Sequence, residues 1–298
     1  MDIELYTKNF KIYLFRLGYA QTTIKHNTNS LWLFLSYLSE QHVKELKQVE
    51  PKHIVAYNEH LHGLKSRITN LGLNGKTIGQ KINVVRLFSQ YLEATQQLKI
   101  FTTSVDIIPS VKKHKEILSR EQIKNLYNQT DDSIMGLRDR ALLGLYYGCG
   151  LRYTEGIKVE INHIDYKKEL LFITPSKNYH SRYIPINNRI LKDFKEYEIH
   201  ARVYFTTPVL FKTLTKNTFI TGSISNSYLN KWLQNLCNKA NINKTITLHS
   251  LRHSIATHLL QQEMPLEQIA RFLGHNTIRA TQMYTHIVEE LKHEKNGK

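Results

Sequence analysis

Residues 247–286 read TLHSLRHSIATHLLQQEMPLEQIARFLGHNTIRATQMYTH and carry histidine, arginine and tyrosine side chains at distinctive spacings. Arg252 follows His249 by three residues, so a helix over this segment places both side chains on one face. His275 stands directly after a Leu-Gly pair, and Tyr284 comes nine residues further on. The segment therefore indicates a mainly helical region that contains a chemical site.

Upstream of this region the pattern changes from helix to strand. Residues 138–148 are predicted to be helical, whereas residues 161–186, INHIDYKKELLFITPSKNYHSRYIPI, are rich in β-branched and aromatic residues. Alternation over Leu170–Thr174 and a further short run over Tyr183–Ile186 predict about three antiparallel strands. After Arg189 the chain is predicted to be mainly helical again. The carboxy-terminal part is therefore a mixed domain with a minor sheet among helices.

The amino-terminal third is predicted to be a helical bundle. Two segments, 22–40 and 74–94, carry apolar residues at helical spacing. These residues are Ile24, Leu31, Phe34, Leu35 and Leu38 in the first and Ile78, Ile82, Val85, Phe88 and Leu92 in the second. Thr22 or Thr23 is available as the cap of the first helix, and Pro51 is expected near the start of another.

Three parts are expected along the chain: a helical domain over 1–100, a linker over 101–116 and a mixed domain over 117–298. The linker segment loses helical periodicity and carries lysines around a histidine. Helical character resumes with Ser119 as a cap and Gln122 behind it.

The net charge of +16 is the strongest feature of the composition. Before and including Glu116 there are 16 Lys/Arg against 9 Asp/Glu, and after it there are 25 against 16. Both parts are basic, which favours a protein that binds a polyanion such as nucleic acid with both halves. The basic linker is then expected either to lie along a phosphate backbone or to be a solvated tether. A generally basic soluble protein is the alternative.

The same composition excludes some other classes of protein. Cys149 and Cys237 are the only cysteines and show no metal-type spacing, so a reducing compartment is expected. The acidic amino terminus has no uninterrupted apolar core of a signal peptide, and no apolar run reaches the length of a membrane span. We expect a cytoplasmic protein with no membrane partner.

Five short segments of the second domain together resemble the signature of the tyrosine recombinases, the family of phage integrases and Xer-type resolvases. In chain order they are GLRYTE (150–155), K-x-x-x-x-R-x-x-P (177–185), HSLRH (249–253), LGH (273–275) and MYTH (283–286). The helical amino-terminal part is similar to that family's core-binding domain, so the resemblance covers nearly the whole chain. One departure is Cys149, where a threonine or similar small polar residue is commoner.

The resemblance implies six catalytic residues, namely Arg152, Lys177, His249, Arg252, His275 and Tyr284. Tyr284 would be the nucleophile, and a phenol with an ordinary pKa near 10 needs a proton acceptor or a strongly positive site. The two arginines suit a phosphorane, because each presents a planar fork of donors that keeps its proton. Arg152 is expected in a turn that enters a helix.

The roles of the remaining groups are also implied by the resemblance. His249 is the candidate base, His275 donates a hydrogen bond to the phosphate, and Lys177 is the general acid for the departing 5′ oxygen. The alternatives are that the histidines are satisfied helix-end residues and that Lys177 only grips phosphate. Glu155 is expected to support the arginine-bearing helix, and His253 to be structural.

The resemblance implies a clamp on duplex DNA that forms a 3′-phosphotyrosyl bond and recombines two duplexes through a Holliday junction. No metal, ATP or other cofactor is expected. Recombination would use a homotetramer, in which the tail after Tyr284 docks on a neighbour or folds onto its own domain. Accessory recombination proteins are possible partners.

Three other functions remain open at this point. One is a DNA-binding protein that keeps the fold without activity, and it is disfavoured because every motif position is filled. A type IB topoisomerase shares the chemistry but differs in its amino-terminal half. A metal-dependent nuclease needs a carboxylate cluster that the sequence does not provide.

Overall fold

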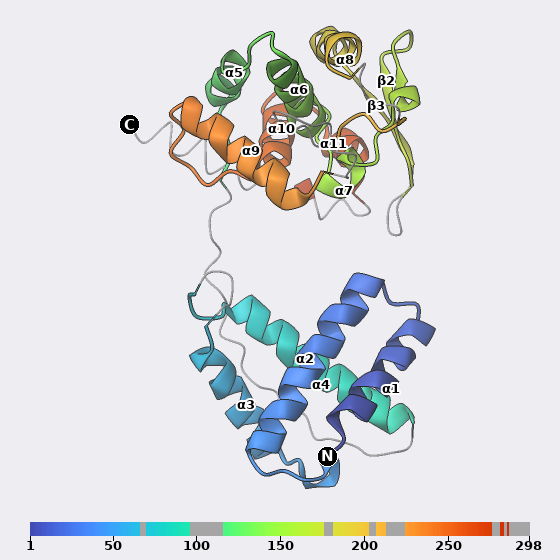
Figure 1. The fold of residues 1–298 in the computed structure, drawn as a ribbon, viewed down its shortest axis with the longest axis vertical. Helices are drawn as coiled ribbons and strands as arrows, with labels where there is room; N and C mark the ends of the chain where they lie inside the picture. The colour runs from blue at the N-terminus through green and yellow to red at the C-terminus, as the bar shows by residue number, and fades with distance from the viewer. Residues whose placement is uncertain are drawn as a thin grey trace. The chain divides into compact units, whose positions relative to one another are not determined.

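In a computed structural model, the chain forms two compact units, Met1–Lys113 and His114–Lys298 (Figure 1). The structure describes residues 1–65, 70–95, 116–175, 181–202, 207–212, 224–275, 281–282 and 285. Apart from Glu116, the predicted linker over 101–116 lies outside them. The domain boundaries at residues 100 and 117 stay predictions.

In its described residues, the first unit is a bundle of four α-helices and one short 3-10 helix. These are α1 (Ile3–Arg16), α2 (Gln21–Glu40), η1 (Leu46–Gln48), α3 (Pro51–Gly63) and α4 (Gly75–Ala94). All ten apolar residues predicted to line the two longest helices are buried. Aromatic rings extend this core, with Phe10 edge-on to Phe88 at 5.5 Å between ring centroids.

The starts of these helices test the predicted caps. Pro51 occupies the first turn of α3, where its missing N–H leaves no helical hydrogen bond unmade, as predicted. The predicted cap at Thr22 or Thr23 is wrong, because α2 already begins at Gln21 and both threonines lie within its first turn. Ala20 is the residue at the N-cap, with extended backbone.

The second unit combines helices with a small sheet, which confirms the predicted fold class. Its elements are α5 (Arg120–Asn128), α6 (Ile134–Leu143), the π-turn η2 (Gly144–Gly148), α7 (Tyr153–Gly156), η3 (Ile161–His163), β1 (Ile164–Asp165), β2 (Leu170–Ile173), β3 (Arg182–Pro185), α8 (Asn188–His200), α9 (Asn226–Lys239), α10 (Leu248–Leu260) and α11 (Leu266–Leu273). The three strands are antiparallel in the order β1-β2-β3, and Ile173 pairs with Arg182.

Two helix starts in this unit bear on the predicted helix boundaries. Ser119 caps α5 in a reciprocal capping box with Gln122, as predicted. The helix expected from Arg138 begins earlier, at Ile134, because Ser133 accepts a hydrogen bond from the backbone N–H of Gly136.

A left-handed glycine leads the chain from the π-turn into α7. Gly150 has φ of +60°, and a Cβ there would lie 3.0 Å from Leu273 and 3.2 Å from Phe272 of α11. The following turn makes Arg152 the N-cap residue of α7. The close approach that glycine allows therefore places α7 beside the end of α11. None of the helices in the described ranges combines the length and the apolar composition that a membrane span requires.

Candidate active site

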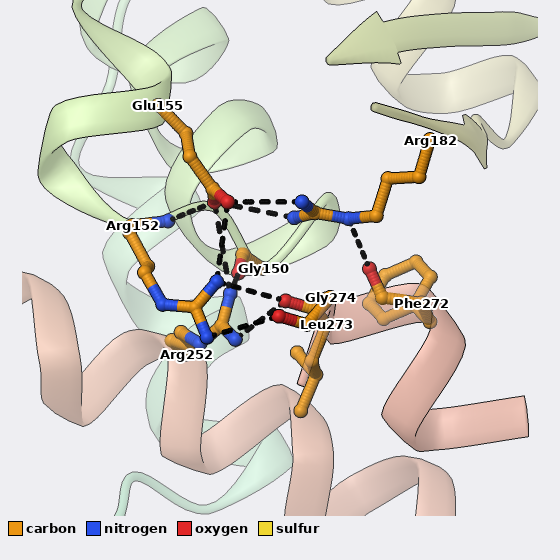
Figure 2. A network of polar contacts seen from close by, with 8 residues as sticks. All are labelled: Gly150, Arg152, Glu155, Arg182, Arg252, Phe272, Leu273 and Gly274. Atoms are coloured by element: carbon orange, nitrogen blue, oxygen red, sulfur yellow. Dashed lines mark hydrogen bonds and ion pairs between the residues drawn. The ribbon is translucent and has the colours of Figure 1, made fainter. Parts of the chain in front are cut away.

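Three arginines from three separate elements converge on one buried carboxylate (Figure 2). Arg152 comes from the start of α7, Arg182 from β3 and Arg252 from α10, and all three face Glu155 of α7. The side chains of Glu155 and Arg252 are each only 3% exposed. The cluster has three positive charges against one negative charge, so its net charge is positive.

Glu155 is the centre of this cluster. Its carboxylate accepts hydrogen bonds from Arg182 at 2.9 and 3.2 Å, from the Arg152 guanidinium at 3.1 Å and from the Arg152 backbone N–H at 2.9 Å. Burial opposes ionisation, but the hydrogen bonds and charges of Arg182 and Arg152 keep the pKa of this carboxyl below its ordinary value. Glu155 therefore holds the arginine-bearing turn, as predicted.

The carboxyl end of α11 is held by the same arginines. Arg252 donates to the carbonyl oxygens of Gly150 and Leu273, each at 2.6 Å. Arg152 donates to those of Leu273 and Gly274, each at 3.2 Å. The last carbonyls of a helix have no partner within the helix and carry partial negative charge, so guanidinium donors stabilise this end.

His275 follows this helix end and lies close to the cluster. Gly274 ends α11 in the left-handed conformation, with φ of +64°. Burial, together with the charges of Arg252 and Arg152, lowers the pKa of His275 to about 4. Its Nδ1 lies 2.8 Å from the hydroxyl of Thr281. The imidazole is therefore neutral near pH 7, beside two guanidinium groups.

His249 lies in the first turn of α10, which confirms the predicted helix that it shares with Arg252. The two side chains differ in burial, because His249 is exposed and Arg252 is buried. The ring of His249 lies 6.2 Å from that of His253, one turn further along the helix.

Two predicted site residues, Lys177 and Tyr284, lie outside the described residues. In the sequence, Lys177 falls between strands β2 and β3, and Tyr284 falls nine residues after His275. Their roles stay predictions. The structure thus brings together Arg152, Arg252 and His275 out of the six predicted residues.

Arg182 is also a member of the cluster, although the motif spacing predicted no role for it. Its side chain is 10% exposed, and besides Glu155 it contacts the carbonyl oxygen of Phe272 at 3.0 Å. The spacing from Lys177 and Pro185 singled it out, but nothing in the strand pattern indicates that it turns towards α7.

The sequence patterns also did not predict a polar pair between Tyr147 and His258. The Tyr147 hydroxyl lies 2.9 Å from Nδ1 of His258 on α10, and His258 is 4% exposed. Burial and the charge of Arg120 lower the pKa of His258 to about 4. Arg120 also donates to the His258 carbonyl oxygen at 2.9 Å, so the start of α5 is bound to α10.

An open groove of about 530 Å³ borders the arginine cluster between β3 and α11. Arg182, Gly274 and His275 lie on its wall beside apolar atoms of Tyr183 and Phe272. Among the described residues, no group of three or more His, Cys, Asp or Glu side chains could hold a metal ion.

Residues 116–290 match the phage integrase family. The chain is 29% identical to tyrosine recombinase XerD of Staphylococcus haemolyticus (strain JCSC1435), over 96% of this chain and 93% of that protein. It is 28% identical to tyrosine recombinase XerD of Staphylococcus aureus (strain N315), over 91% of this chain and 89% of that protein.

Solved structures share the fold at lower identity. XerH site-specific recombinase, bound to a palindromic difH substrate in a post-cleavage complex, has a TM-score of 0.74 at 19% identity and covers 92% of this chain and 79% of its own. The Tn1549 transposon integrase, in complex with transposon right end DNA, has a TM-score of 0.72 at 16% identity and covers 99% of both chains. Since the family match spans more than half of the sequence, this chain belongs to the phage integrase family and is a site-specific DNA recombinase of the tyrosine type.

Proposed function

We propose that this chain cleaves duplex DNA by attack of the Tyr284 hydroxyl oxygen on a backbone phosphorus. A tyrosyl–phosphate bond forms to the 3′ side of the break, and the bond from phosphorus to the 5′ oxygen breaks. The resulting 5′ hydroxyl of one duplex then attacks the phosphotyrosyl bond of a partner duplex and releases Tyr284. Two rounds of exchange pass through a Holliday junction.

The observation that carries this proposal is the net positive cluster of Arg152, Arg182, Arg252 and Glu155 beside His275. A phosphoryl group under attack gains negative charge on its nonbridging oxygens. Arg152 and Arg252 supply preorganised guanidinium donors for that charge. A buried site with low dielectric strengthens this attraction relative to water.

Three further residues complete the proposed reaction. His249 accepts the proton of Tyr284, and its exposed place at the start of α10 supports access to DNA. The lowered pKa of His275 supports a neutral imidazole. In the proposed reaction this imidazole donates a hydrogen bond to a phosphate oxygen. Lys177 gives a proton to the departing 5′ oxygen.

The proposed reaction exchanges one phosphodiester for another, so the number of such bonds is unchanged and no ATP is consumed. Arginine and lysine side chains neutralise the phosphate in place of a metal ion. Cleavage that persists in EDTA is therefore expected, whereas loss of cleavage on chelation would favour a metal-dependent nuclease.

Both halves of the chain are basic, and we propose that both bind the duplex as a clamp. In recombination, four protomers assemble on two duplexes, and the segment after Tyr284 docks on a neighbour. Deletion from Glu289 onward is expected to spare DNA binding and impair synapsis. Unchanged recombination by that variant would remove the docking of the tail.

Trapping of a covalent intermediate tests this function. A target duplex is first selected from a random-sequence pool by binding to the full-length protein. In a version of this duplex with a nick close to the cleavage point, the short fragment that carries the free 5′ hydroxyl dissociates after cleavage. Religation is then prevented, so the phosphotyrosyl adduct accumulates. The recombinase is expected to form an adduct that denaturing electrophoresis resolves, while a binding protein without activity forms none. Relaxation of supercoiled plasmid without strand exchange would favour a topoisomerase.

A further inference from the structure

Arg182 connects three parts of the second unit that are far apart in the sequence. It lies on β3, donates two hydrogen bonds to Glu155 of α7, and donates a third to Phe272 in the last turn of α11. Figure 2 shows the guanidinium between the carboxylate and this helix end. With its side chain 10% exposed, Arg182 is less accessible than Arg152, whose side chain is 16% exposed.

The charges of this cluster indicate what Arg182 does for its neighbours. Glu155 lies 3.1 Å from the Arg152 guanidinium and 3.9 Å from that of Arg252. Without Arg182, the negative charge of the buried Glu155 carboxylate would be balanced by the Arg152 and Arg252 guanidinium groups alone. Glu155 would then compete with a phosphate for these two groups. Arg182 offsets that charge through the shortest of the three guanidinium contacts, at 2.9 Å.

The end of α11 leaves room for Arg182 and for no side chain at position 274. A Cβ on Gly274 would lie 2.5 Å from Nη1 and 2.7 Å from Cζ of Arg182. Gly274 therefore serves both the left-handed backbone and the close packing of the guanidinium. Both residues also lie on the wall of the groove beside the site.

We propose that Arg182 is a positioning residue for strand cleavage: it neutralises Glu155 and so leaves Arg152 and Arg252 available to the scissile phosphate. This inference rests on the proposed function, since it takes Arg152 and Arg252 as the phosphate ligands. Arg182 itself acts through Glu155 and does not contact the reacting atoms. A purely architectural arginine would instead matter only for stability.

A charge-balance experiment separates the two roles. Full-length wild type, Arg182→Gln, Arg182→Lys, Glu155→Gln and the double variant Glu155→Gln/Arg182→Gln are compared for single-turnover adduct formation on the nicked, selected duplex. Binding of the duplex and thermal unfolding are measured for each. Arg189→Gln is the matched control, because Arg189 is an exposed arginine of the same unit that stacks over the Tyr127 ring, 4.2 Å from its centroid.

Arg182→Gln is expected to slow cleavage by about 10- to 100-fold, the range for loss of a charged hydrogen bond, with duplex affinity nearly unchanged. Arg182→Lys keeps the charge and is expected to recover most of the rate. The double variant removes both charges, so it is expected to cleave faster than Arg182→Gln alone. If Arg182→Gln unfolds, the double variant is compared with Glu155→Gln instead, and similar cleavage rates are expected because Arg182 then has no carboxylate to neutralise.

Two results would overturn the inference while leaving the proposed function intact. One is a wild-type cleavage rate for Arg182→Gln, and the other is a double variant that cleaves no faster than Arg182→Gln. Absence of any adduct with the wild-type protein is a different result, which would overturn the proposed function and this inference with it.

Discussion

Arg252 donates a hydrogen bond of 2.6 Å to the carbonyl oxygen of Leu273, the last residue of α11. A second bond of equal length joins it to the Gly150 carbonyl oxygen in the turn before α7. The side chain that we propose as a phosphate ligand therefore also links the helix ends around the site. Its loss has consequences for both stability and cleavage.

Arg252→Ala is expected to lower the free energy of unfolding by roughly 2–5 kcal/mol, because the Gly150 carbonyl oxygen loses a buried donor and the Leu273 carbonyl oxygen keeps only the longer bond from Arg152. The cleavage rate of the folded variant is also expected to fall by about 100- to 1,000-fold, because a preorganised charge donor is lost. Urea unfolding and single-turnover adduct formation on folded protein measure the two effects separately. The exposed Arg189→Ala serves as the control and should change neither by much. Normal cleavage by Arg252→Ala would exclude Arg252 as a phosphate ligand.

Gly274→Ala is expected to destabilise the protein more than Gly18→Ala does. Both glycines have left-handed backbone, with φ of +64° and +75°, so both substitutions carry a conformational strain of about 1–2 kcal/mol. Among the described residues, a Cβ at Gly18 meets nothing within 4 Å, whereas one at Gly274 meets the Arg182 guanidinium. Thermal or urea unfolding of the two variants gives the difference, and equal losses would contradict the tight packing at Arg182.

The acid stability of the protein is expected to depend on His258. Its pKa is about 4 in the folded chain, below the ordinary value of 6.5, because burial and Arg120 disfavour the proton. As the pH falls from about 6.5 to 4, the unfolded chain binds this proton first, so the free energy of unfolding declines. Above about pH 7 the contribution of His258 to the free energy of unfolding no longer changes with pH.

His258→Gln tests this dependence, since all other titrating groups are shared with the wild type. Urea unfolding between pH 4 and 8 is expected to show a shallower acid decline for the variant than for the wild type. Parallel stability profiles would contradict a neutral, buried His258. Its contact with Tyr147 at 2.9 Å makes some loss of stability at every pH expected as well.

Lys177→Ala is expected to cleave slowly on an ordinary duplex, because the departing 5′ oxygen then lacks its proposed proton donor. Replacing that oxygen with sulfur at the cleavage point supplies a leaving group that needs no proton. Single-turnover adduct formation on the two duplexes is the measurement. Recovery with sulfur supports Lys177 as the acid, and an equal defect on both duplexes would make it only a phosphate-binding residue.

Helical periodicity predicted much of this fold. The apolar stripe from Ile24 to Leu38 and the stripe from Ile78 to Leu92 both form the buried faces of helices. The cap of α2 was missed because the helix begins before its threonines, at Gln21. The π-turn over Gly144–Gly148 also escaped, since its residues continue the apolar pattern of the preceding helix.

The site was predictable in its residue types but not in its connections. The motif spacing indicated Arg152, Arg252 and His275, which the structure brings to one place. The place of Arg182 depends on contacts with Glu155, 27 positions away, and with Phe272, 90 positions away. Local patterns in a sequence carry no information about such convergence, so the role of Arg182 required the structure.

The phosphotyrosyl bond to Tyr284 is the central claim of this account. Wild-type protein and Tyr284→Phe are incubated with the nicked, selected duplex, and the adduct is digested and mapped by mass spectrometry. The account predicts a nucleotide attached to the peptide that contains Tyr284, and no adduct with Tyr284→Phe despite duplex affinity close to that of the wild type. An adduct on another residue, or one that persists in Tyr284→Phe, would contradict it.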